Sequence, residues 1–172
     1  MSRDEAFVEE FRRIFAEEFE SLFRYLCRLT GDPATAADTA QEAFVRLYQR
    51  GEGPRDTRAW LAAVSNNLVR DEYRRTTRRR NLLEANPTFF VYGEPVPAPD
   101  EELDVRERRR RVRNALDRLP VRYRQALLLR QEGYSYREIA SAIDYRASGV
   151  GKLIVRATQA FRNAYEAADA SE

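Results

Sequence analysis

Hydrophobic residues recur every three or four positions through the first part of the chain, a spacing that places them on one face of a helix. From residue 7 to residue 29 the pattern predicts one long amphipathic helix, and a bend or break near residues 17–20 stays open at this stage. Gly31 ends this helix, and Asp32-Pro33 begins a second one at 33–50, because a carboxylate N-cap and a first-turn proline both favour helix entry. The inner face predicted for the second helix comprises Ala37, Ala40, Phe44, Leu47 and Tyr48.

A third helix is expected after the glycine-rich break at 51–54, with Asp56 or Thr57 as its N-cap. Its far end, 70–80, holds six arginines against two acids. Positive charge for phosphates together with aromatic rings for unstacked bases suits single-stranded or distorted nucleic acid. Trp60 on the same helix is interpreted as a core residue, because a tryptophan at helical spacing is more often buried.

The helical pattern stops in the segment 82–102, which contains four prolines. Each proline disfavours helix in the residue before it, so this segment is interpreted as a mostly extended linker. It separates two predicted helical domains, 1–81 and 103–172. An aromatic stretch at 89–92 is the exception within the linker, and its role stays open.

The second domain ends in the pattern of a helix-turn-helix. Helix resumes by Leu103, Pro120 opens a further helix, and Gly133 ends it. Ser135 and Glu138 have the spacing of a capping box, which predicts that a new helix begins directly after Ser135. A short interruption precedes a second apolar set, formed by Val150, Leu153, Ile154 and Ala157.

Small residues at Ala140 and Gly149 would let these two short helices cross closely, as a helix-turn-helix requires. Gly149 and Gly151 each weaken the second helix by roughly 1 kcal/mol relative to alanine, unless a close approach requires them. Lys152 and Arg156 fall on its solvent face, which suits entry into a DNA groove. An ordinary helical hairpin with solvated charges is the alternative interpretation.

Composition supports an all-α fold of two small helical domains. Gly and Pro are scarce, 34% of residues are charged, and no extended runs of Val, Ile and Thr occur. The net charge is only +2, but residues 1–20 carry seven acids against three arginines, whereas 122–165 carries eight basic residues against three acids. A basic second half favours a polyanionic partner.

The types of residue present limit the catalytic and metal-binding chemistry that the chain could perform. The chain has no histidine and one cysteine, Cys27, so imidazole catalysis and Cys/His metal sites are excluded or nearly so. We therefore expect no enzyme activity, no cofactor and no metal. Cys27 is interpreted as a small core residue in a reducing compartment, and a cytoplasmic location without membrane insertion is expected from the absence of a long apolar run or signal pattern.

Several of these segments together resemble a known family, the bacterial extracytoplasmic-function sigma factors of the sigma-70 family. The segments 19–33 and 37–48 look like the polymerase-binding helices of sigma region 2, and 60–75 resembles its melting and minus-ten segment. The stretches 116–129 and 133–157 look like the minus-thirty-five reader of sigma region 4. The resemblance covers nearly the whole chain outside the linker.

The resemblance implies a role for individual residues. The clamp coiled coil of the largest polymerase subunit would face Asp38, Gln41, Glu42 and Arg46. A flipped minus-ten base would be held by Asn67 with the loop 53–57, and the opened strand would be followed by Arg70, Arg74, Arg75 and Arg78. The minus-thirty-five duplex would be read by Ser148, Gly151, Lys152, Val155 and Arg156, with phosphates contacted by Arg122, Arg124 and Arg137.

The function implied is that of a transcription initiation factor, which binds core RNA polymerase, directs it to promoter DNA and assists melting. An anti-sigma factor is a further partner that the sequence leaves open. The alternative is a helix-turn-helix regulator that binds duplex DNA without the polymerase core. A nucleic-acid enzyme is disfavoured by the missing imidazole and metal ligands.

Overall fold

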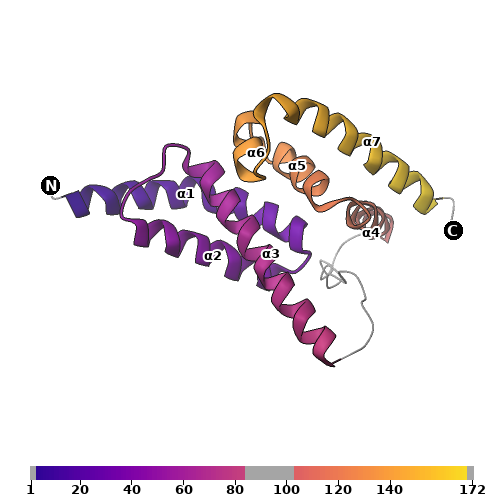
Figure 1. Ribbon diagram of the computed structural model, residues 1–172, viewed down its shortest axis with the longest axis horizontal. Coiled ribbons are helices and arrows are strands. Elements are labelled where there is room, and N and C mark those ends of the chain that lie inside the picture. Colours follow the sequence, from indigo (N-terminus) through magenta and orange to yellow (C-terminus); the bar gives the residue numbers. More distant parts are fainter. Residues whose placement is uncertain (1–2, 84–102, 170–172) are drawn as a thin grey trace.

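The computed structural model describes residues 3–83 and 103–169, and within these ranges every regular element is a helix (Figure 1). This confirms the all-α class. The first half of the described chain contains α1 (Arg3–Thr30), α2 (Pro33–Arg50) and α3 (Thr57–Leu83). The second half contains α4 (Leu103–Asp117), α5 (Val121–Gln131), α6 (Tyr136–Ala142), the short 3₁₀ helix η1 (Ala147–Gly149) and α7 (Val150–Asp169). The aromatic stretch 89–92 lies outside the described residues.

Aromatic side chains join α1 to α2 in the first half. The ring of Phe44 on α2 meets the rings of Phe15 and Phe11 edge-on, with centroids 4.9 and 6.2 Å apart. Such edge contacts are a favoured geometry for aromatic pairs. Further along α1, Leu22, Tyr25 and Leu26 are fully buried. α1 is assigned as one continuous helix, so the break left open near residues 17–20 does not occur.

The predicted limits of α2 are confirmed at both ends. The Asp32 carboxylate accepts hydrogen bonds from the backbone N–H groups of Ala34 and Thr35, and Gly51 ends the helix with a φ of 72°. That left-handed conformation is cheap only for glycine. One expectation for the inner face was wrong, because Tyr48 is 52% exposed. The Tyr48 ring, near the end of α2, meets the Phe11 ring edge-on with centroids 5.2 Å apart, so it packs against α1 while about half of the residue stays exposed.

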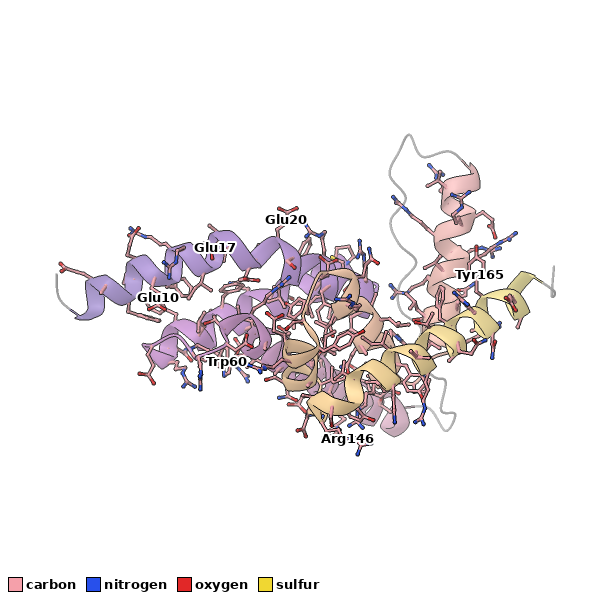
Figure 2. The ribbon with its side chains drawn as sticks, turned by 90° about the horizontal axis from the view of Figure 1, so that it is seen from above. Glu10, Glu17, Glu20, Trp60, Arg146 and Tyr165 are labelled. Carbon is pink, nitrogen blue, oxygen red and sulfur yellow. The ribbon has the colours of Figure 1, made fainter. Side chains whose placement is uncertain are left out.

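Asp56 is the residue that caps α3, because its carboxylate accepts from the N–H of Ala59. Trp60 lies half-buried against the core of the first half, in agreement with its interpretation as a core residue (Figure 2). α3 continues to Leu83, two residues past the expected domain limit. Its later turns carry the arginine-rich stretch and extend away from α1 and α2 (Figure 1).

In the second half, the long α7 packs against α4 and α5, and Figure 2 shows it extending from the turn at Arg146 to Tyr165 beside α4. The predicted capping box is present at the start of α6. The Ser135 N–H donates to the Glu138 carboxylate at 2.6 Å, while the Ser135 hydroxyl accepts from the Glu138 N–H. The helix-turn-helix therefore consists of α6, η1 and α7.

The two halves are in contact with each other. α3 packs against α6, and α1 packs against α5. Thus α6, the first helix of the helix-turn-helix, packs against α3, which is the helix that carries the arginine-rich stretch. This arrangement decides which candidate surfaces are open to a partner.

Candidate nucleic-acid and protein interfaces

One exposed face runs from Ser148 in η1 through the first two turns of α7, and it is called the face of α7 for short. Ser148, Lys152, Val155 and Arg156 are all exposed, and Gly151 between them is partly so. Val155 is 69% exposed, the largest value among the bulky hydrophobic residues of the described chain. Two cations that flank an exposed apolar side chain can contact phosphates, base edges and a thymine methyl group in a major groove. The residues predicted to read duplex DNA therefore share one accessible surface.

Close packing at the preceding turn fixes the direction of α7. Ala140 on α6 and Gly149 in η1 are buried, as their small size predicts. A Cβ atom at Gly149 would lie 2.8 Å from the Tyr145 ring and 2.9 Å from Nε of Arg146. Gly149 is therefore required by a close approach, whereas a Cβ at Gly151 would meet only Tyr136 at an ordinary 3.6 Å.

The three arginines expected on phosphates differ in accessibility. Arg137 on α6 and Arg122 on α5 are exposed, and the Arg122 guanidinium lies 5.5 Å from the ring centroid of Tyr145. Arg124 is only 4% exposed and donates to the carboxylate and the carbonyl oxygen of Asp117. A phosphate contact does not fit that burial, and Arg124 instead ties α5 to the end of α4.

The residues expected on the minus-ten strand lie along α3. Asn67, Arg70, Arg74 and Arg75 are exposed, and Arg78 lies further along the same helix. Asn67 accepts a hydrogen bond from Arg70, and Arg75 pairs with Glu72. Asn67 stands ten residues, or about 15 Å, along the helix from the loop 53–57, so the structure does not bring these two parts of the expected base pocket together.

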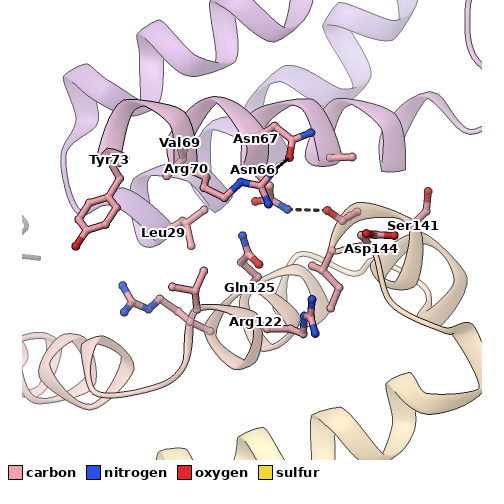
Figure 3. A pocket seen from close by; sticks show the side chains of 15 residues that line it. Leu29, Asn66, Asn67, Val69, Arg70, Tyr73, Arg122, Gln125, Ser141 and Asp144 are labelled. Carbon is pink, nitrogen blue, oxygen red and sulfur yellow. Dashed lines mark hydrogen bonds between the residues drawn. The ribbon is translucent and has the colours of Figure 1, made fainter. Parts of the chain in front are cut away.

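A cavity of about 410 Å³ separates the two halves next to these residues (Figure 3). Asn67, Arg70 and Tyr73 of α3 line one side, while Arg122 and Gln125 of α5 line the other. Ser141 and Asp144 close it at the end of α6. Figure 3 shows Arg70 and Arg122 on opposite walls, so cations from both halves border one space.

Sequence reasoning missed the polar residues that join the two halves of the chain around this cavity. The buried amide of Asn66 accepts from the Tyr25 hydroxyl at 2.6 Å and donates to the carbonyl oxygen of Ala142 at 2.9 Å. The Glu132 carboxylate receives hydrogen bonds from Arg24 and Arg28. The one sequence signal at Glu132 is its carboxylate directly before Gly133, at the predicted end of a helix. Nothing in the local pattern indicates a contact with α1.

The outer face of α2 is the third candidate surface. Asp38, Gln41, Glu42 and Arg46 are all exposed, as expected, and Arg46 donates to Glu42 at 2.8 Å. Beside them lies a groove of about 510 Å³ between α1 and α2, which is lined by Phe11, Phe15, Phe19, Ala37, Gln41, Phe44, Val45, Tyr48 and Gln49. An apolar groove with polar residues at its edge is a common form of protein-binding surface.

Metal binding, thiol chemistry and membrane insertion each require particular features of the described residues. No group of three metal-ligating side chains occurs among them. Cys27 is half-buried against the core, and burial raises the pKa of its thiol, which lowers the fraction of reactive thiolate. No helix in the described ranges has the length and apolar character needed to cross a bilayer.

Two family models match the chain. Sigma-70 region 2 matches residues 14–79, and Sigma-70, region 4 matches residues 109–160. The ECF RNA polymerase sigma factor SigL of Mycobacterium tuberculosis is 32% identical over 157 residues, which cover 88% of this chain and 86% of that protein. SigE of Mycolicibacterium smegmatis is 30% identical over 176 residues, covering 98% of this chain and 66% of SigE.

A further curated relative and one solved structure are also similar to the chain. The ferric citrate uptake sigma factor FecI of Escherichia coli is 28% identical, with 82% of this chain and 87% of FecI covered. Among solved structures, the sigma factor RpoE of Bartonella quintana, in complex with the anti-sigma factor NepR, superposes with a TM-score of 0.74. The identity is 18%, and the match covers 92% of this chain and 98% of RpoE, so it supports the fold.

Proposed function

This chain belongs to the extracytoplasmic-function sigma factors of the sigma-70 family, and from that premise we propose which partner each of its three exposed surfaces binds during transcription initiation. It is an initiation factor associated with RNA polymerase, in a family that is regulatory rather than enzymatic. We place no catalytic step on the chain itself. The division expected from the sequence, 1–81 and 103–172 with a linker at 82–102, is part of this proposal, and the matched ranges 14–79 and 109–160 support it.

The outer face of α2 is the proposed contact with core polymerase. Its four polar residues Asp38, Gln41, Glu42 and Arg46 are exposed on one helix, and the aromatic groove beside them supplies apolar area. Interfaces usually combine such an apolar centre with a polar edge. An anti-sigma factor is a further proposed partner, by analogy with the Bartonella quintana complex.

Promoter DNA is the proposed partner of α3 and α7. Arg70, Arg74, Arg75 and Arg78 would follow the opened minus-ten strand, and Asn67 would contact a base there. The face of α7 formed by Ser148, Gly151, Lys152, Val155 and Arg156 would read the minus-thirty-five duplex, with Arg122 and Arg137 on phosphates. Arg124 is left out of this set because it is buried against Asp117. The observation that carries the proposal is that matched sigma regions 2 and 4 each present one exposed cationic helix face.

Reconstituted transcription tests the proposal. Purified core polymerase of Mycolicibacterium smegmatis or Escherichia coli, with and without the chain, should initiate on templates selected from a randomised promoter library only when the chain is present. A chain that shifts duplex DNA equally well without core enzyme, and gives no specific transcript with it, would instead support the polymerase-independent regulator.

The polymerase contact can be tested separately. The double variant Asp38→Arg with Gln41→Arg should abolish co-migration with core enzyme while its helical circular dichroism stays unchanged. The matched control is Ala16→Arg with Glu17→Arg, which makes the same change of +3 in charge at exposed positions of α1. Figure 2 shows Glu17 extending outward from α1. Equal loss in both variants would contradict a specific role for the α2 face.

A further inference from the structure

The cavity between the two halves has the size of a small-molecule pocket. Its volume is about 410 Å³, and pockets for small ligands occur preferentially where two domains meet. α3 forms one wall, while α5 and the end of α6 form the other (Figure 3). The functions proposed above use some of the lining residues individually but leave the space itself without an occupant.

Two arginines border the cavity from opposite walls. Arg70 of α3 and Arg122 of α5 are both exposed, and neither makes an ion pair with a carboxylate among the described residues. Arg70 donates a hydrogen bond to Asn67, and the Arg122 guanidinium lies 5.5 Å from the ring centroid of Tyr145. A planar guanidinium binds phosphate through two parallel hydrogen bonds. Two arginines that face one space without a carboxylate partner therefore suit a phosphate group.

Amide side chains add hydrogen-bonding groups to the same space. The Gln125 amide extends from α5 into the cavity (Figure 3), and it has no hydrogen-bond partner among the described residues. Asn67 on the facing wall uses its amide oxygen to accept from Arg70, which leaves its NH₂ group out of that bond. An amide side chain can pair with the edge of an adenine ring through one donor and one acceptor.

The two ends of the cavity differ in polarity. Tyr73, Val69 and Leu29 lie at one end, and Asp144 lies at the other (Figure 3). An apolar wall beside a tyrosine ring favours the flat face of a base, because every base can stack on such a surface. The Asp144 carboxylate disfavours a ligand with several negative charges. The lining therefore fits an aromatic ring with a single phosphate better than a polyphosphate.

We propose that this cavity binds a purine nucleoside monophosphate. Its phosphate lies between Arg70 and Arg122, its base packs toward Tyr73, and the edge of the base pairs with Gln125. The site goes beyond the proposed function, because neither core polymerase nor promoter DNA is needed to fill it. Gln125 has no part in the surfaces proposed for those partners, so it is the residue on which the site can be tested alone.

Titration calorimetry of the full chain with AMP, in a buffer of low ionic strength, is the main test. The wild type should bind one AMP per chain. Gln125→Leu keeps the size of the side chain and removes the amide, so it should weaken AMP binding about threefold or more. The matched control is Gln131→Leu, which makes the same change at an exposed position of the same helix outside the cavity and should bind AMP as the wild type does.

A second pair of variants tests the phosphate contact. Arg122→Ala should weaken AMP binding about tenfold, because hydrogen bonds to charged groups are stronger than neutral ones. Arg118→Ala removes an exposed arginine that does not line the cavity and should have little effect. Helical circular dichroism of every variant checks folding, and Gln125→Ala takes the place of Gln125→Leu where the latter loses helix.

Other probes decide the chemical class. Adenosine and inorganic phosphate should each bind much more weakly than AMP, since each makes only part of the contacts, and ATP should bind more weakly because of Asp144. A side-chain amide signal that is missing from the nitrogen-15 spectrum of Gln125→Leu should shift when AMP is added to the wild type.

Three results would overturn the site: no saturable binding of AMP, an equal loss in Gln125→Leu and Gln131→Leu, or inorganic phosphate that competes as well as AMP. A single-stranded oligonucleotide of mixed sequence that displaces AMP and binds more tightly would instead assign the space to a strand. Failure of the chain to support transcription would count against the proposed function, and would leave these binding measurements valid.

Discussion

The two surfaces proposed for promoter DNA differ in access, although both are cationic faces of long helices. On α7, Lys152, Val155 and Arg156 are exposed, and Val155 is 69% exposed. On α3, Arg70 and Tyr73 border a cavity whose opposite wall is the second half of the same chain. The composition of a surface therefore does not decide whether it can bind, because the packing of the rest of the chain also has to leave it open.

The same difference predicts how substitutions on the two helices affect folding stability and DNA binding. The exposed side chains Lys152, Val155 and Arg156 of α7 take no part in the contacts described above between the halves. Their substitution should therefore change DNA binding with little effect on folding. Asn66 and Arg58 on α3 hold helix ends of the second half. Changes near them should alter the closed arrangement and the DNA surface together.

The largest effect is expected on α7. Each base or phosphate contact of this kind contributes about 1–3 kcal/mol, so Lys152→Ala with Arg156→Ala should reduce transcription that depends on the minus-thirty-five element on the order of a hundredfold. Thermal unfolding and core binding should remain as in wild type, because both side chains are exposed. The control is Arg162→Ala, further along the same helix, and an equally large loss there would contradict groove reading by the first two turns.

A pH-dependent loss of stability is expected from the closed contact. Burial raises the pKa of Tyr134 to about 12 from the ordinary tyrosine value of 10.0. The unfolded chain loses the phenolic proton first, so the stabilisation is complete below pH 10 and is lost as pH rises through about 12. The loss is at most about 2–3 kcal/mol.

Urea unfolding across the alkaline range measures this loss. Tyr134→Phe should remove the extra slope between pH 10 and about 12, whereas Tyr48→Phe, at a phenol that is 52% exposed, should retain it. A wild-type slope in Tyr134→Phe would show that another group is responsible.

Substitution of the two glycines next to the reading face should have smaller effects on stability, and the two effects should have opposite signs. Gly149→Ala places a methyl group 2.8 Å from the Tyr145 ring, and overpacking of this kind typically destabilises by about 1–3 kcal/mol. Gly151→Ala meets its nearest atom at 3.6 Å and should stabilise the helix by roughly 0.5–1 kcal/mol. Unfolding of both variants in the same buffer checks the signs, and the same sign in both would contradict a tight turn at Gly149.

The helix limits were predictable wherever a local residue determines them. Asp32-Pro33, Gly51 and the Ser135 capping box all act through their own backbone neighbours, and the structure confirms α2 at 33–50 and a helix that begins after Ser135. The exposure of α7 was predictable for the same reason, because helical period alone separates its apolar side from Lys152 and Arg156.

The contact between the halves was not predictable, because it joins residues about a hundred positions apart. Glu132 pairs with Arg24 and Arg28, and charged residues at such positions are usually solvated. Arg124 was expected on phosphate from the family resemblance, while its burial beside Asp117 follows from how α4 and α5 meet. The helical period also predicted Tyr48 on the inner face of α2. The period alone does not show how completely a neighbouring helix covers each position on that face.

The smallest expected effect concerns the N-cap of α2. Asp32→Ala removes the N-cap of α2, which should destabilise the chain by about 1 kcal/mol. Hydrogen bonds from Thr35 hold the pKa of Asp32 below the ordinary aspartate value of 3.8, so the stabilisation is present above that pH and is lost as pH falls. Chemical unfolding at neutral pH, and again below pH 3.8, should show the wild type and Asp32→Ala converging in acid.

The matched control is Asp38→Ala, which removes a carboxylate from an exposed position further along the same helix. Surface substitutions of this kind usually change stability by less than about 0.5 kcal/mol, so the two variants separate loss of the cap from loss of a negative charge. An equal loss in both variants, or a difference between wild type and Asp32→Ala that persists in acid, would contradict capping by the Asp32 carboxylate.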